Sequence, residues 1–231
     1  MPTPIPAPKP PMLTFIDNFT ADRVPRLHWY DRPGGGWTLP TAMARLINEH
    51  TIHWSEVHTP PDMPDRYYLD MIGREAYYHA NQRDWEPAAP GIQGGDGIMY
   101  HYMIAPTGTI FYVTAETHRT WNAYEANETN IATCMLAGHG DKVQPAASLA
   151  LKALLTWMAW GRTDLPLITP TPRNVALLGA DGHVTNYRSA GTLTHDESLI
   201  RHGRAPKGCC GIYAAVVEQW RQEQPDHSPY K

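Results

Sequence analysis

Short apolar segments of two kinds alternate along the chain, and their order predicts the fold class. The first kind is brief and rich in β-branched and aromatic residues, as in 50–54, which ends at a proline-rich loop. Such a segment is typical of a buried strand. The second kind repeats an apolar residue every four positions without proline, as in 65–82, and predicts an amphipathic helix. Further strands are expected at 99–105, 109–114, 131–137, 175–178 and 191–194, and further helices at 147–158 and 212–222. This order predicts an α/β fold, with a central mixed β-sheet flanked by helices.

The chain of 231 residues has the size of one domain. Six prolines lie within residues 2–11 and predict an extended proline-rich tail at 1–12. One domain is expected over 13–231, with 13–49 as an extension packed on it. The start of the chain lacks a basic segment followed by an apolar run, so no signal peptide is expected. The longest apolar stretch, 148–161, is too short to span a bilayer.

Charge and cysteine content exclude several classes of function. The net charge of −4 gives no electrostatic footprint for nucleic acid or an anionic membrane, so neither is expected as a partner. Three cysteines cannot form a disulfide framework. Twelve histidines stand against five lysines, which makes a metal site worth searching for.

Three residues from separate segments are candidate ligands. His53 lies at the end of a predicted strand, His195 follows the predicted strand at 191–194, and Cys209 lies just before the last helix. A catalytic zinc typically has three protein ligands, with imidazole nitrogen and thiolate sulfur among the preferred donors, and one open position for water. His202 is an alternative to His195, because it lies nearer to Cys209 in the sequence.

Several blocks, in a fixed order, resemble one family. The blocks are Thr-Ile-His-Trp-Ser at 51–55, Met-Tyr-His-Tyr-Met-Ile at 99–104, Thr-Gly-Thr-Ile at 107–110, Trp-Asn-Ala at 121–123, Thr-His-Asp at 194–196 and Lys-Gly-Cys at 207–209. Together they resemble the zinc-dependent N-acetylmuramoyl-L-alanine amidases, a family that includes phage lysozyme-type amidases and peptidoglycan recognition proteins. The resemblance covers about residues 50–222.

The resemblance implies the peptidoglycan recognition protein-like amidase fold and a zinc hydrolase. The implied reaction cleaves the amide between N-acetylmuramic acid and L-alanine in peptidoglycan. Peptidoglycan would therefore be the partner. The chain is expected to be monomeric. One zinc per chain is implied. The implied metal ligands are His53, His195 and Cys209; the implied catalytic residues are Tyr100 and Lys207; the implied substrate-binding residues are Trp54, Trp121 and Asn122.

Departures from the family pattern refine this interpretation. Cys134 stands where one branch of the family has a glutamate general base, and Cys209 stands where that branch has an aspartate ligand. Both differences favour the branch that uses a tyrosine and a cysteine ligand, which makes Tyr100 more important. Asn122 replaces a histidine of many relatives. Cys210 replaces a proline, which leaves open whether Cys209 or Cys210 binds zinc.

Structural roles remain open for the same residues. Cys134 is expected to be a small buried side chain, and His101 to face the other side of the sheet from Tyr100. Core packing is an equal interpretation for Trp54. Asp196 is expected either to orient a ligand imidazole or to be a surface acid.

The favoured function is a phage or prophage endolysin, made in the cytoplasm and acting on the cell wall after release. Two alternatives belong to other classes of function. One is a peptidoglycan-binding protein without catalytic activity, and the retained His, His and Cys argue against it. The other is a cytoplasmic amidase that recycles muropeptides, and Cys134 at the glutamate position argues against it.

Overall fold

The computed structural model describes residues 9–14, 49–81, 98–114, 120, 122–123, 127, 130–160 and 192–223. The expected strand at 175–178 and the residue Trp121 lie outside these residues. No helix among the described residues has the length and apolar character needed to cross a membrane.

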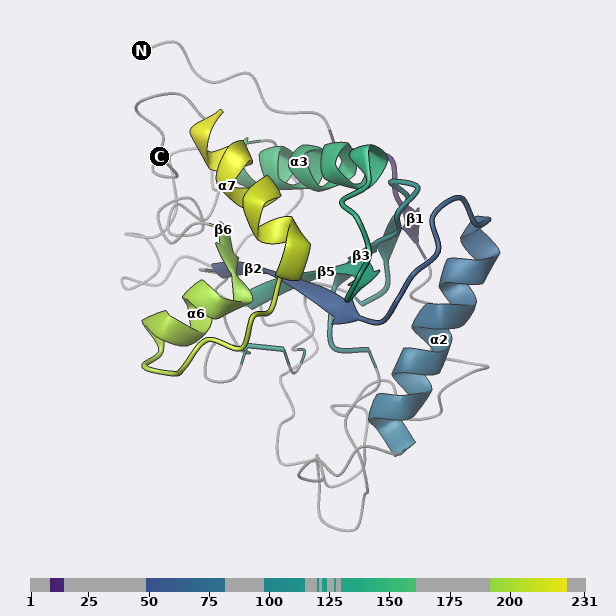
Figure 1. Cartoon of the computed structure of the whole chain (residues 1–231), viewed down its shortest axis with the longest axis horizontal. Helices are drawn as coiled ribbons and strands as arrows, with labels where there is room; N and C mark the ends of the chain where they lie inside the picture. Colours follow the sequence, from purple (N-terminus) through teal and green to yellow (C-terminus); the bar gives the residue numbers. More distant parts are fainter. Residues whose placement is uncertain are drawn as a thin grey trace, which may run out of the picture.

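A mixed sheet forms the centre of the described structure (Figure 1). Its six strands are β1 (Leu13–Thr14), β2 (Glu49–Glu56), β3 (Tyr102–Ile104), β4 (Ile110–Tyr112), β5 (Asn130–Gly138) and β6 (Thr192–Thr194). They lie in the order β1-β4-β3-β5-β2-β6. Strands β3 and β4 form an antiparallel hairpin, whereas β2 pairs in parallel with both β5 and β6. The predicted mixed sheet is confirmed.

Helices cover both faces of this sheet. The described helices are α2 (Asp65–Asn81), α3 (Pro145–Trp160), α6 (His195–Arg201), the short 3-10 turn η3 (Gly211–Tyr213) and α7 (Ala214–Gln222). Helices α3 and α7 pack on one face and α2 on the other (Figure 1). All nine residues of β5 are buried because both of its faces are covered. Along β5, Met135 faces the α3 and α7 core, whereas Cys134 and Leu136 face the α2 core.

Strand β3 is shorter than the sequence predicts and begins at Tyr102 rather than at residue 99. At this point the side chain of His101, just before β3, takes part in the pairing with β5. The backbone N–H of Ala132 donates to Nδ1 of His101 at 3.1 Å, where a regular ladder would use a backbone carbonyl. Tyr100 therefore lies in an irregular segment just before the strand.

The end of the predicted tail contacts the domain. Pro10 is buried, and Met12 packs against the core beneath α3 and α7. The ammonium of Lys9 lies 5.1 Å from the centre of the Trp157 ring. These contacts bring residues 9–14 to the sheet, where β1 pairs with β4. The proposed domain boundary at residues 12 and 13 stays a prediction.

Helix α6 is absent from the sequence-based expectations, although its start has a recognisable signal. Thr194 caps the helix by accepting the N–H of Glu197, and the Glu197 carboxylate accepts the N–H of Thr194. This reciprocal capping box is encoded by Thr-x-x-Glu at 194–197. The chain consequently turns from strand to helix directly before His195.

Candidate metal centre

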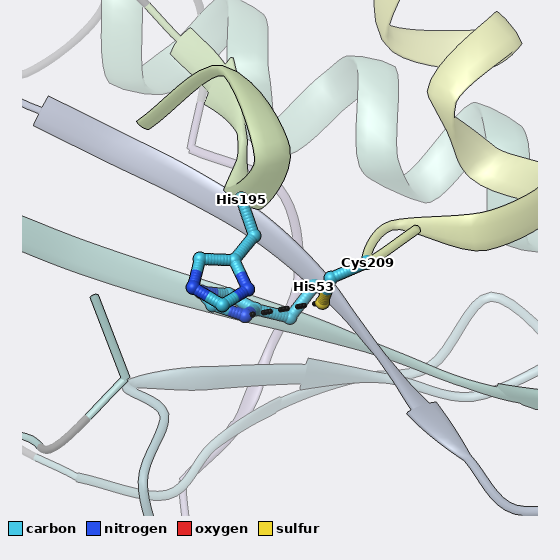
Figure 2. A group of neighbouring side chains, drawn as sticks. All are labelled: His53, His195 and Cys209. Atoms are coloured by element: carbon cyan, nitrogen blue, oxygen red, sulfur yellow. Dashed lines mark hydrogen bonds between the residues drawn. The ribbon is translucent and has the colours of Figure 1, made fainter. Parts of the chain in front are cut away.

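Three potential metal ligands converge at the β2–β6 edge of the sheet. His53 comes from β2, His195 from the first position of α6, and Cys209 from the loop before η3 (Figure 2). One ligand atom from each lies within 4.8 Å of the other two. Nδ1 of His53 is 3.5 Å from Sγ of Cys209, and the two imidazole rings are 4.3 Å apart between centres. His53 is buried, whereas His195 and Cys209 are partly exposed.

Strand register brings the two histidines together. Ile52 of β2 pairs with Thr194 of β6 in parallel register. The residue that follows each of these is His53, still on β2, and His195, the first residue of α6. Adjacent parallel strands lie about 4.8 Å apart, which suits two side chains that share one ion.

Asp196 attaches the cysteine loop to the second histidine. Its carboxylate accepts the backbone N–H groups of Lys207 at 2.8 Å, Gly208 at 2.9 Å and Cys209 at 3.3 Å. The sequence left Asp196 as either a partner of a ligand imidazole or a surface acid, and the structure gives it a third role. Because Asp196 follows His195 directly, its carboxylate holds the loop of Cys209 against the backbone next to His195.

A second brace fixes the start of α6. The guanidinium of Arg221, on α7, donates to both carboxylate oxygens of Glu197 at 2.7 Å and to the carbonyl of Thr192 at 2.6 Å. Burial opposes ionisation of Glu197, but the hydrogen bonds from Arg221 and Thr194, together with the Arg221 charge, outweigh burial and lower the pKa of this carboxyl. Helix α7 thus holds the junction of β6 and α6 that carries His195.

The two adjacent cysteines occupy different environments. Cys209 points its Sγ toward His53, whereas Cys210 is fully buried in the core beneath α3 and α7. Cys210 has a left-handed backbone with φ of 84°. Gly211 follows it so closely against Trp54 that a Cβ there would lie 2.3 Å from the indole ring. The geometry favours Cys209 as the ligand, which the sequence left open.

The alternative ligand His202 is engaged elsewhere. Its Nε2 lies 3.2 Å from Oε1 of Glu49, at the start of β2. Ser198 and Arg201 also donate to the Glu49 carboxylate. His202 therefore belongs to a polar cluster under α6, and His195 is the histidine that meets His53.

Both imidazoles of the site are held neutral. Burial, and then the neighbouring His195, lower the pKa of His53 well below its ordinary value. Burial, and then the Lys207 ammonium, lower the pKa of His195 to about 4. Burial raises the pKa of the Cys209 thiol, and hydrogen bonds from the backbone of Trp54 and Cys210 oppose this. Metals bind neutral imidazole and thiolate, so binding would release the thiol proton.

The donor set fits zinc. Two nitrogen donors and one sulfur donor match the ligands that a catalytic zinc takes from protein, with one coordination position left for water. Nδ1 of His195 is buried and has no hydrogen-bond partner in the part of the chain that the structure describes. A buried imidazole nitrogen without a partner costs free energy that coordination of a metal would recover.

A family model described as N-acetylmuramoyl-L-alanine amidase matches residues 44–201, which is more than half of the chain. The chain belongs to this family. The match includes His53 and His195 and ends before Cys209. A comparison with curated protein sequences finds no significant match.

Several solved structures align over almost the whole chain. Drosophila peptidoglycan recognition protein SD is 15% identical, covers 95% of this chain and 98% of its own, and gives a TM-score of 0.52. Peptidoglycan recognition protein LE, solved in complex with tracheal cytotoxin, is 12% identical, with coverages of 90% and 93% and a TM-score of 0.54. The endolysin amidase LysCS from Clostridium intestinale URNW is 12% identical, with coverages of 92% and 97% and a TM-score of 0.48. The first two show the expected fold.

Tyr100 lies beside the site that the family resemblance assigns to it. Its ring centre is 5.2 Å from that of His53. Burial, and then the neighbouring Cys134, raise the pKa of Tyr100 well above its ordinary value, so its hydroxyl keeps its proton. The hydroxyl forms a hydrogen bond with the Cys134 thiol, which is fully buried as expected. Tyr100 therefore presents a neutral O–H close to the ligands, and its catalytic role stays a prediction.

The remaining residues that the resemblance singles out differ in position. Lys207 is exposed, and its charge lies near enough to lower the pKa of His195. Trp54 packs in the core on the face opposite His53, with its ring edge against His139, and its burial favours the packing interpretation. Asn122 is buried behind His53 and hydrogen-bonded to Thr51. A substrate contact of any of these residues stays a prediction.

Sequence reasoning missed the polar residues that surround His53. Thr51, two positions earlier on β2, places its hydroxyl 3.1 Å from Nε2 of His53. Asn130, at the start of β5, donates to that hydroxyl at 2.7 Å. The alternation of a strand provides a signal for Thr51, since residues two apart face the same side. Asn130 belongs to a block that resembles the family, but its contact with Thr51 depends on strand pairing, which no local pattern indicates.

Proposed function

We propose that this chain is a zinc-dependent N-acetylmuramoyl-L-alanine amidase that hydrolyses the amide between N-acetylmuramic acid and L-alanine in peptidoglycan. Family membership supports action on peptidoglycan, by hydrolysis or by binding. One observation carries the choice of hydrolysis. His53, His195 and Cys209 come from three separate segments and place their donor atoms within 4.8 Å of one another.

The proposed ligands would hold one zinc ion per chain. When bound, zinc lowers the pKa of a coordinated water toward neutrality and polarises a carbonyl oxygen. The chain's own residues would orient the ion: β2 and β6 fix the two imidazoles in register, and Asp196 fixes the loop of Cys209.

Two residues are proposed to handle charge during amide cleavage. The neutral hydroxyl of Tyr100 would donate a hydrogen bond to negative charge that develops on the carbonyl oxygen. The ammonium of Lys207 would stabilise the same charge from the exposed side of the site. Donors arranged before the reaction begins often supply the largest share of such stabilisation.

Binding without hydrolysis is the main alternative within the family. Protein LE was solved with tracheal cytotoxin, a monomeric diaminopimelic acid-type peptidoglycan, so a related fold holds such a ligand. The complete set of two imidazoles and one thiol in this chain favours the enzyme, because a binding groove does not need an open metal site.

We also propose a biological setting, which rests on the sequence resemblance. The chain is proposed to be a phage or prophage endolysin that reaches the cell wall after release. Cys134 at the family's glutamate position favours this over a cytoplasmic recycling amidase. Hydrolysis of intact sacculi separates the two settings. An endolysin should cleave them, whereas a recycling amidase acts on soluble muropeptides.

Metal analysis and product analysis test the proposed function together. The purified protein should contain about one zinc per chain, and a chelator should remove both the zinc and the release of products from purified sacculi, with zinc restoring activity. Mass spectrometry should find new L-alanine amino ends on the released stem peptides and intact glycan strands. Cleaved glycan, or zinc-loaded protein that binds sacculi without releasing peptides, would contradict the proposal.

A further inference from the structure

The two nitrogens of His53 face different surroundings. Nδ1 points to the candidate metal position, 3.5 Å from Sγ of Cys209. Nε2 points back into the domain, 3.1 Å from the hydroxyl oxygen of Thr51. A neutral imidazole carries its proton on one nitrogen only. Zinc can bind through Nδ1 only when the proton resides on Nε2, so whatever fixes the proton there prepares the ligand.

The side-chain amide of Asn122 has a defined orientation. Its nitrogen lies 2.6 Å from the hydroxyl oxygen of Thr120 and 3.4 Å from the Thr120 carbonyl. A carbonyl oxygen only accepts hydrogen bonds, so the amide NH₂ group must point toward Thr120. The amide oxygen consequently points the other way, toward Thr51 and His53, where it lies 3.2 Å from the Thr51 hydroxyl oxygen.

The hydroxyl of Thr51 completes the assignment. It accepts a hydrogen bond from Nδ2 of Asn130 at 2.7 Å. Its own proton goes to an amide oxygen, either that of Asn122 at 3.2 Å or that of Asn130 at 3.0 Å. With that proton on an amide oxygen, the hydroxyl has an acceptor position left for His53, and Nε2 is then the donor.

The side chain of Asn127 fixes the backbone of the segment that carries Asn122. Oδ1 of Asn127 accepts the N–H of Asn122 at 2.8 Å and that of Ala123 at 2.7 Å. Asn122 is only 8% exposed, so its amide is held in place rather than free to rotate in solvent. A fixed acceptor behind a ligand histidine is the arrangement that tunes many metal sites.

We propose that Asn122 is a positioning residue whose amide oxygen, together with the Thr51 hydroxyl, fixes His53 in the Nε2–H form and presents the Nδ1 lone pair to zinc. This inference rests on the zinc site of the proposed function. It gives Asn122 a role behind the ligand, in place of the substrate contact that the family resemblance implies.

The test compares Asn122→Leu with Asn122→Asp in the full chain. Leucine has nearly the shape of asparagine without an acceptor, and aspartate keeps the acceptor oxygen. Competition with a chelator should show zinc affinity about 10- to 100-fold lower for Asn122→Leu, the usual effect of losing such a partner. Asn122→Asp should stay within a few-fold of the parent protein or bind zinc more tightly.

Thr133→Val is the matched control. Thr133 is also buried on the sheet, and its hydroxyl is 2.8 Å from Nε2 of His50 rather than of His53. Its substitution should lower the melting temperature while leaving zinc affinity unchanged. A loss of zinc affinity as large as that of Asn122→Leu would show that any buried polar deletion disturbs the site and would overturn the inference.

Nitrogen-15 NMR of the metal-free protein at neutral pH gives an independent readout. The parent and Asn122→Asp proteins should show His53 as the Nε2–H form, and Asn122→Leu should show a mixture of both forms. An unchanged tautomer in Asn122→Leu overturns this inference, whether or not zinc binds. Absence of zinc binding by the parent protein refutes the proposed function instead, so the two failures are distinguishable.

Discussion

The two faces of strand β2 carry opposite chemistry. Ile52 and Trp54 point into the apolar core beneath α3 and α7. Thr51 and His53, which alternate with them, point to the other face and meet Asn122, Asn130 and Cys209 instead. One strand thus divides its residues between the apolar core and the candidate metal site. The difference implies that stability and metal binding can be changed separately by substitutions one residue apart.

Cys209→Ser should have the largest effect, and only on the metal-binding face. The hydroxyl is a much poorer zinc ligand than the thiolate, so zinc affinity should fall on the order of a thousandfold and hydrolysis of sacculi should be lost. Zinc analysis after gel filtration and a turbidity assay on sacculi measure both. Stability of the metal-free protein should change little, because Cys209 is partly exposed.

Cys210→Ala is the control on the apolar face. It should keep one zinc per chain and full activity, while the free energy of unfolding falls by about 1 kcal/mol because a small buried side chain is shortened. If Cys210→Ala lost zinc and Cys209→Ser kept it, the ligand would be Cys210 and the comparison of the two cysteines would be wrong.

Ile52→Ala should show the reverse pattern. Ile52 is fully buried between α3, α7 and the sheet, so truncation should cost about 2–5 kcal/mol in the free energy of unfolding. Urea denaturation with a chelator present measures this without a contribution from the metal. The folded fraction should still bind zinc with nearly unchanged affinity. A large loss of zinc affinity at temperatures where the variant is folded would show that the two faces are coupled.

Asp196→Asn should lower zinc affinity by about tenfold. The amide keeps the size of the carboxylate but loses the charge that strengthens its bonds to the backbone of 207–209, so the Cys209 loop should be less well held. Chelator competition measures the change. Glu218→Gln, which also removes one negative charge at an exposed position, should leave affinity unchanged. Equal effects of the two variants would indicate a general effect of charge.

Tyr100→Phe should have the smallest effect and act on turnover alone. Loss of the hydroxyl should lower kcat about tenfold with zinc content unchanged, because the ring still packs beside His53. Tyr102→Phe is the control, since Tyr102 lies in the opposite core and stacks on Tyr112. Unchanged kinetics of Tyr100→Phe would remove Tyr100 from the mechanism and leave it a packing residue.

Local patterns were sufficient to predict most of the described elements. The apolar repeat of 65–82 predicts α2, and the β-branched segment 50–54 predicts the centre of β2, because each pattern matches the period of its element. Helix α6 was missed although its capping box is visible in the sequence. The last helix was predicted as continuous from 212, whereas it begins as the 3-10 turn η3.

The candidate site was predicted as a set of residues but not as a structure. The choice between His195 and His202 depends on the pairing of Ile52 with Thr194, which no local pattern encodes. The choice between Cys209 and Cys210 depends on the left-handed backbone at Cys210. The roles of Asp196 and Asn122 depend on contacts between segments far apart in the chain, and such contacts leave no periodic signal.

The separation of the candidate ligands along the chain has a consequence for biosynthesis. His53 and Cys209 are 156 positions apart. The register of β2 and β6 brings His53 to His195, and the Asp196 carboxylate brings the Cys209 loop there. A growing polypeptide therefore cannot bring the three candidate ligands together until Cys209 has left the ribosome. Binding of an ion at the candidate site would follow the closing of a long loop. It would therefore report that synthesis has passed Cys209 and that the sheet has formed.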